Sequence, residues 1–131
     1  MTYLFDINIC TKLINNKSDF SERIRERFIN LHSNNLCISS ITCAGLYLCA
    51  IKSSDARKKV DLFLNPFDII DFDECAAIEY SKIIGSLDQR NKDISMLDSM
   101  LAAQAVSRGY TLVSDMHSFK QISPLKLEIW A

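Results

Sequence analysis

YLFDIN, residues 3–8, is a short apolar run that stops at a carboxylate. Its first three residues are of the β-prone kind that fills a fully buried strand, and such a strand normally ends at a turn residue. Asp6 fits that structural role. Open parallel α/β sheets also place their ligand sites at the carboxyl ends of their strands. The rest of the chain therefore decides whether Asp6 is a turn residue or part of a site.

Strand-like and helix-like segments alternate along the chain. The patterns predict further strands over residues 35–41, 67–72, 110–114 and 125–130. They predict helices over residues 19–32, 42–53, 54–64, 73–87 and 95–108, the fourth of which ends in the polar stretch 88–93. This alternation favours an α/β fold, in which a mainly parallel sheet of about five strands carries helices on both faces.

Three cap patterns mark expected helix starts. Asp19 with Glu22, and Ser95 with Asp98, have the spacing of a capping box. Thr42 is the expected N-cap of the helix that follows the second strand. The second of these capping boxes places Asp98 in the first turn of its helix.

The composition describes one soluble domain over residues 1–131. A hydrophobic content of 48% is enough for a real core, and a net charge of −1 gives no overall attraction for nucleic acid. Five cysteines are an odd number in a chain that opens without a basic leader, which favours buried, reduced thiols. No apolar run approaches the roughly 18 residues that span a bilayer. We therefore expect a cytoplasmic protein with no membrane partner.

Two further carboxylates fall where they could join Asp6. Asp115 directly follows the strand 110–114, and Asp98 lies in the helix before that strand. If this strand is a neighbour of the first, the three carboxylates meet at one edge of the sheet. Such a cluster repels itself unless a divalent cation neutralises it, and oxygen ligands suit Mg²⁺ or Mn²⁺. The chemistry that follows is metal-assisted attack of water on a phosphodiester.

Each of these side chains also has a purely structural interpretation. Asp6 could end a strand, Asp98 could complete a capping box, and Asp115 could start a turn. Asn8 could bond a carboxylate or a metal-bound water, or could cap the next helix. Taken singly, each residue is explained by structure alone. Their joint placement is what favours a site.

Four segments together resemble the PIN-domain toxins of the virulence-associated protein C (VapC) type. These segments are YLFDIN (3–8), ISSITCAGL (38–46), ISMLDSMLAAQAVSRGYTLVSD (94–115) and LKLEIW (125–130). The resemblance covers nearly the whole chain and implies one PIN domain with a parallel sheet between helices. It also implies a small bacterial endoribonuclease, the toxin of a type II toxin-antitoxin module.

The resemblance assigns a role to each candidate side chain. Asp6 is similar to the first metal ligand, with Asn8 as the Asn of a D-x-N signature, and Asp98 is similar to the second ligand in a D-x-x-x-A-A segment. Asp115 resembles a further acidic position after the strand. The implied catalytic set is Asp6, Asn8, Asp98 and Asp115, with the three aspartates around Mg²⁺ or Mn²⁺.

The resemblance also implies partners. The substrate would be structured RNA, such as a transfer or ribosomal RNA loop. A cognate antitoxin would inhibit the enzyme by lying across the active site, operator DNA would be contacted only through the antitoxin complex, and the toxin would form a homodimer.

Gly45 departs from this resemblance, because the family carries a glutamate at that position. A glycine costs the helix up to about 1 kcal/mol relative to alanine, and it leaves Thr42 without a capping-box partner. It also removes a carboxylate, although Mg²⁺ commonly uses only one or two. Two functions therefore stay open: a metal-dependent endoribonuclease, or a catalytically weak or inactive PIN domain that acts as an antitoxin-binding, operator-regulating partner.

The segment from Thr42 to Leu64 holds more apolar side chains than one helical face needs. They are Leu46, Tyr47, Leu48, Ile51, Val60, Leu62 and Phe63. Core packing explains this excess, and so does an interface for an antitoxin helix or a second subunit.

Overall fold

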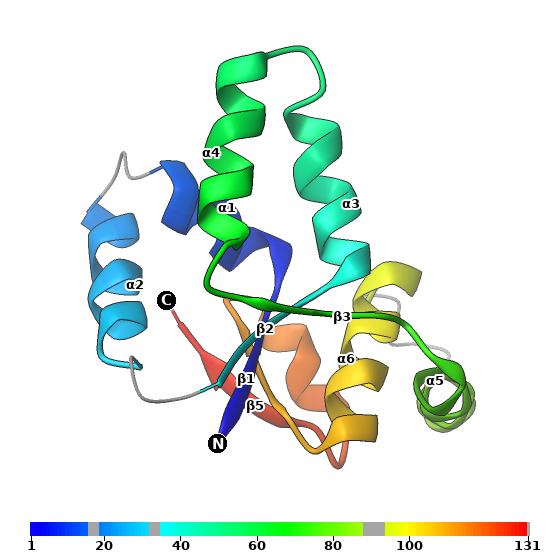
Figure 1. Cartoon of the computed structure of the whole chain (residues 1–131). Helices are drawn as coiled ribbons and strands as arrows, with labels where there is room; N and C mark the ends of the chain where they lie inside the picture. Colours follow the sequence, from blue (N-terminus) through cyan, green and yellow to red (C-terminus); the bar gives the residue numbers. More distant parts are fainter. Residues whose placement is uncertain (16–18, 32–34, 88–93, 131) are drawn as a thin grey trace.

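A five-stranded sheet runs through the molecule in the order β3-β2-β1-β4-β5, and every neighbouring pair is parallel (Figure 1). The computed structural model describes residues 1–15, 19–31, 35–87 and 94–130. The strands are β1 (Thr2–Phe5), β2 (Asn35–Ser39), β3 (Asp68–Ile70), β4 (Thr111–Ser114) and β5 (Lys126–Ile129). The predicted α/β fold with a parallel sheet of five strands is confirmed.

Helices cover both faces of this sheet, as expected for parallel strands joined by crossovers (Figure 1). They are α1 (Ile7–Asn15), α2 (Asp19–Ile29), α3 (Ser40–Cys49), α4 (Ser54–Leu64), α5 (Glu74–Ser86) and α6 (Met96–Arg108), with a short 3₁₀ helix, η1 (His117–Gln121). The helices α3 and α4 stand side by side as a hairpin. None of the described helices is long and apolar enough to cross a bilayer.

Two hydrophobic cores lie on the two faces of the sheet because side chains alternate along a strand. On β1, Tyr3 and Phe5 join the core beneath α1, α2, α3 and α4, whereas Leu4 joins the core beneath α5, α6 and η1. The central strand is thus buried on both sides. This explains why YLF is an uninterrupted apolar run.

The start of α3 differs from the prediction. Ser39, and not Thr42, is the N-cap, because its hydroxyl accepts a hydrogen bond from the Ile41 N–H at 3.1 Å. The helix therefore begins at Ser40, directly after β2, and Thr42 is a buried residue within it. The predicted strand 35–41 is correspondingly shorter.

A second difference is α1, which begins immediately after β1. The Asp6 carboxylate caps its first turn by accepting from the Ile9 N–H at 2.9 Å. Asn8 lies inside this helix, so the interpretation of Asn8 as a helix cap is wrong. The sequence patterns did not predict this helix, because Asp6 alone separates it from the strand.

The other boundaries lie close to those predicted. Ser95 caps α6 and Gly109 ends it with a left-handed φ of 67°, a conformation that glycine adopts without strain. The predicted strand 67–72 is reduced to Asp68–Ile70. The predicted helix 19–32 stops at Ile29; residue 32 and the polar stretch 88–93 lie outside the described residues.

The cysteines follow the expectation in part. All five are free thiols, and Cys10, Cys37 and Cys43 are buried, whereas Cys49 and Cys75 are exposed. Burial raises the pKa of the Cys10 thiol well above its usual value, with smaller contributions from neighbouring Asp6 and Cys43. The buried thiols thus pack as small apolar side chains.

Candidate active site

The pairing of β1 with β4 brings Asp6 and Asp115 to the same edge of the sheet. Phe5 is in register with Val113, and the Asp6 N–H continues the ladder by donating to the Val113 carbonyl at 3.1 Å. Beyond this point the segments that follow β1 and β4 leave the sheet at the carboxyl ends of these strands. Open parallel sheets usually carry their sites at this edge. The strand adjacency on which the predicted cluster depended is therefore present.

Asp6 is a buried carboxylate with only 2% of its surface exposed. One oxygen, Oδ1, accepts from the Ile9 N–H, and the other, Oδ2, accepts from the Ser114 hydroxyl. Ser114 is itself oriented, because its oxygen also accepts from the Met116 N–H at 3.0 Å. These contacts hold the Asp6 carboxylate in one orientation.

The electrostatic environment of Asp6 is unfavourable for its negative charge. Burial raises its pKa from 3.8 to about 6; the hydrogen bonds from Ser114 and Ile9 oppose this rise, and the charges of Asp115 and Asp98 add to it. Both acids are therefore close enough to act on Asp6. A cation at this place would relieve the burial penalty and the repulsion together.

Asp115 is held by two side chains of α1. Its Oδ2 lies 2.5 Å from the Lys12 ammonium, and its Oδ1 accepts from the Asn8 amide at 3.4 Å. Asn8 thus contacts a carboxylate, which is one of the roles considered for it. Lys12 supplies a positive charge within a group of acidic residues.

Asp98 makes the cap contact that its spacing with Ser95 predicted. The Ser95 hydroxyl accepts from the Asp98 N–H at 3.1 Å and donates to Asp98 Oδ2 at 2.9 Å. The carboxylate is partly buried and lines a pocket of about 310 Å³ together with Ile7 and Gly45. A capping role and a place beside the site are therefore both present for Asp98.

The donor set fits an open magnesium or manganese site. Within the described ranges, no three His, Cys, Asp or Glu side chains are grouped tightly enough to enclose an ion. Mg²⁺ does not require such a cage, because it usually keeps several waters and uses one or two carboxylates. A carboxylate offers about four lone-pair positions, so the two hydrogen bonds to Asp6 leave it able to coordinate. Asp6 with Asp98 or Asp115 would be sufficient.

Two residues of this site were missed from the sequence. Lys12 lies one helical turn after Asn8, a spacing that places both side chains on one face, but only once α1 is recognised. Ser114 is the last residue of β4 and immediately precedes Asp115. Its signal was a hydroxyl at the carboxyl end of a buried strand.

A sequence model of the PIN-domain family matches residues 3–123, and the chain belongs to that family. Two similar relatives carry the name VapC. The chain is 34% identical to the tRNA(fMet)-specific endonuclease VapC of Salmonella typhimurium and 33% identical to ribonuclease VapC2 of Rickettsia felis. Each alignment covers 99% of this chain and 98% of the relative. The resemblance to VapC proteins drawn from four sequence segments is confirmed.

Solved structures agree with this assignment over the full chain. One is VapBC2 from Rickettsia felis, bound to a DNA fragment from its promoter. This chain superposes on a chain of that structure with a TM-score of 0.88 at 31% identity, and the superposition covers 100% of both chains. DNA-bound VapBC from Salmonella typhimurium superposes with a TM-score of 0.83 at 32% identity, covering 100% of this chain and 99% of the other.

Proposed function

We propose that this chain is a VapC-type toxin: a ribonuclease that hydrolyses RNA phosphodiester bonds with Mg²⁺ or Mn²⁺. The observation that carries the proposal is the pairing of β1 with β4, which brings Asp6 and Asp115 to the same edge of the sheet. The charges of Asp115 and Asp98 both raise the pKa of Asp6. The names of the Salmonella typhimurium and Rickettsia felis relatives, an endonuclease and a ribonuclease, support the reaction class.

The residues of the site have different roles in this proposal. Asp6 and Asp98 hold the cation, and Asp6 is oriented for this by the Ile9 N–H and the Ser114 hydroxyl. Asp115 and Asn8 position the cation or the attacking water, while Lys12 offsets the charge of Asp115. A bound divalent cation lowers the pKa of water and stabilises charge on the phosphate.

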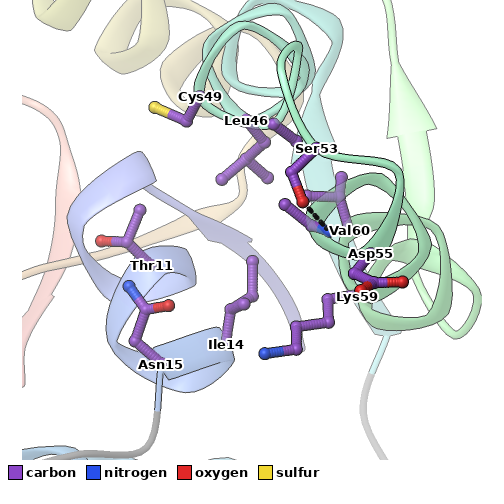
Figure 2. A pocket seen from close by; sticks show the side chains of 11 residues that line it. Thr11, Ile14, Asn15, Leu46, Cys49, Ser53, Asp55, Lys59 and Val60 are labelled. Atoms are coloured by element: carbon purple, nitrogen blue, oxygen red, sulfur yellow. Dashed lines mark hydrogen bonds between the residues drawn. The ribbon is translucent and has the colours of Figure 1, made fainter.

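The proposed protein partner is an antitoxin. Its proposed binding site is a pocket of about 360 Å³ between α1, α3 and α4 (Figure 2). Ile14, Leu46 and Val60 give the pocket an apolar floor, and Asn15 and Lys59 lie at its rim. Such a surface suits an amphipathic helix. Operator DNA would be contacted through the antitoxin; the similar VapBC structures from Rickettsia felis and Salmonella typhimurium are bound to DNA.

Exposed apolar side chains on the α3–α4 hairpin support an interface at this end of the molecule. Leu48, Ile51 and Leu62 are 69%, 74% and 76% exposed, although Leu46 and Val60 of the same segment are buried. The excess of apolar residues between Thr42 and Leu64 is thus only partly used by the core. A second copy of the chain, forming the homodimer that the family resemblance implies, would cover the remainder.

A second candidate function is a PIN domain with weak or no catalysis that serves only as the antitoxin's partner. The observation that favours it is Gly45, which contributes no carboxylate to the pocket lined by Asp98. Both candidates require the same fold and the same partner. They differ in whether RNA is cleaved.

Cleavage of initiator tRNA with Mg²⁺ or Mn²⁺ tests the proposal, because the Salmonella typhimurium relative is named for that RNA. We expect the chain to cleave it, and we expect EDTA, Asp6→Asn and Asp98→Asn each to abolish cleavage. Asp61→Asn is the matched control, since Asp61 is an exposed aspartate on α4. Cleavage that survives Asp6→Asn would overturn the proposal. Cation binding without cleavage of this tRNA or of total RNA would favour the second candidate.

A further inference from the structure

The three acidic residues of the site differ in the charge of their hydrogen-bond partners. Asp6 accepts from a backbone N–H and a hydroxyl, and Asp98 accepts from the hydroxyl of Ser95. All of these donors are neutral. Asp115 instead contacts a full positive charge, because its Oδ2 lies 2.5 Å from the Lys12 ammonium. In the part of the chain that the structure describes, Asp115 is thus the acid of this site that has its own counter-ion.

The ion pair of Lys12 and Asp115 is largely withdrawn from solvent. The Lys12 side chain is 30% exposed and that of Asp115 is 19% exposed. The other oxygen of Asp115, Oδ1, accepts from the Asn8 amide at 3.4 Å. Asn8 and Lys12 are four residues apart on α1, so both project from one face of that helix. Both carboxylate oxygens of Asp115 are therefore engaged from α1, and salt screens such a pair less than a fully exposed one.

The charges of the site match a single divalent cation. Three ionised carboxylates and the Lys12 ammonium leave two negative charges, which one Mg²⁺ or Mn²⁺ neutralises. A second divalent ion would give this partly buried site an excess of positive charge. On Asp115 it would also lie close to the Lys12 ammonium, and like charges repel strongly where solvent is largely excluded.

Nucleases with two-metal sites hold the ions roughly 3.5–4 Å apart, one for the attacking and one for the leaving oxygen. We propose that this chain instead holds one divalent cation, on Asp6 and Asp98, and that the Lys12 ammonium takes the place of a second ion at Asp115. Lys12 is thus a positioning residue, which acts through Asp115 and restricts the site to one ion. This inference rests on the proposed function and deepens it.

Removal of the Lys12 charge tests the restriction. We expect Lys12→Met to bind two Mn²⁺ ions, because Asp115 is then free to hold one, and the unchanged chain and Lys12→Arg to bind one. Lys12→Gln also removes the charge and is the second variant. Lys12→Met combined with Asp115→Asn removes the whole ion pair without changing the net charge, so it should bind one ion. Arg57→Met is the matched control: it frees Asp61 of an exposed ion pair on α4 and should add no ion.

Calorimetric titration with Mn²⁺ counts the bound ions, and electron paramagnetic resonance shows whether two of them are close enough to couple. Circular dichroism shows that each variant is folded. Two ions in the unchanged chain, or one ion in the folded Lys12→Met and Lys12→Gln, would overturn the inference and leave the proposed function intact. A second ion in Lys12→Met combined with Asp115→Asn would also overturn it, since that ion would not depend on the freed carboxylate. Absence of Mn²⁺ binding in all of these proteins would overturn the inference and the proposed metal site together.

Discussion

At the scale of single residues, Asp6 performs a structural task and is suited to a chemical one. It caps α1 through the Ile9 N–H, and it is held by Ser114 in a buried position near two other acids. A turn residue would need only the first of these contacts. In the absence of a cation, burial and the neighbouring charges destabilise the ionised form of Asp6 in the folded protein. This loss of stability can be measured.

The raised pKa of Asp6 predicts how stability depends on pH. The group is protonated more readily in the folded state, so its contribution is fully present below pH 3.8 and is lost as pH rises through about 6. Between pH 4 and 7 we expect the free energy of unfolding to lose on the order of 2–3 kcal/mol from this group. Urea unfolding at several pH values checks this. Asp6→Asn should remove that part of the slope, and an unchanged slope would contradict the assignment.

Lys12 is predicted to compete with the cation for Asp115. Replacing it by methionine removes the ammonium that lies 2.5 Å from the carboxylate and leaves the site more negative. We expect Lys12→Met to tighten Mn²⁺ binding several-fold at low salt, and to lower stability without metal by less than about 1 kcal/mol. Lys12→Arg, which keeps the charge, should leave the Kd nearly unchanged. Weaker Mn²⁺ binding by Lys12→Met would show that Lys12 instead helps to form the site.

At the scale of elements, the site depends on helices that start directly at strand ends. Asp6 directly follows β1 and caps α1, and Ser39 ends β2 and caps α3. In both cases a polar side chain at the end of the strand accepts from an N–H of the next helix. Without a loop between strand and helix, Ile7 at the start of α1 lies close to Gly45 of α3.

Removal of the Ser39 cap tests this arrangement. Ser39 is fully buried and its hydroxyl accepts from the Ile41 N–H, so Ser39→Ala should lower the free energy of unfolding by about 1 kcal/mol. Ser40→Ala is the matched control within the same turn, and its effect should be small because alanine is a better helix former. Chemical denaturation of both variants provides the measurement. Equal effects would contradict the assignment of the cap.

At the scale of the whole molecule, local patterns predicted the order of the strands and helices, except for α1 and the short η1. The capping box of Ser95 and Asp98, the C-terminal Gly109 and the parallel sheet all depend on short-range signals. The placement of Asp6 near Asp115 required one long-range assumption, that β1 pairs with β4. The sequence alone offered no evidence for that pairing beyond the family resemblance.

Other features of the site could not be predicted from local sequence patterns. Lys12 and Asp115 are 103 residues apart, and Ser114 lies 108 residues from Asp6. The contact between Ile7 and position 45 depends on how α1 crosses α3. Such contacts are set by packing between elements, which periodicity and capping rules do not describe.

The most direct test of the central claim is a crystal structure grown with millimolar Mn²⁺ and measured near the manganese absorption edge. We predict an anomalous peak that marks a manganese ion within bonding distance of a carboxylate oxygen of Asp6 and of a second carboxylate, from Asp98 or Asp115. The Ile7 side chain should lie on the α3 side of the ion. A structure in which Asp6 bonds only Ile9 and Ser114, with no anomalous peak beside it, would contradict the claim that these acids hold a cation.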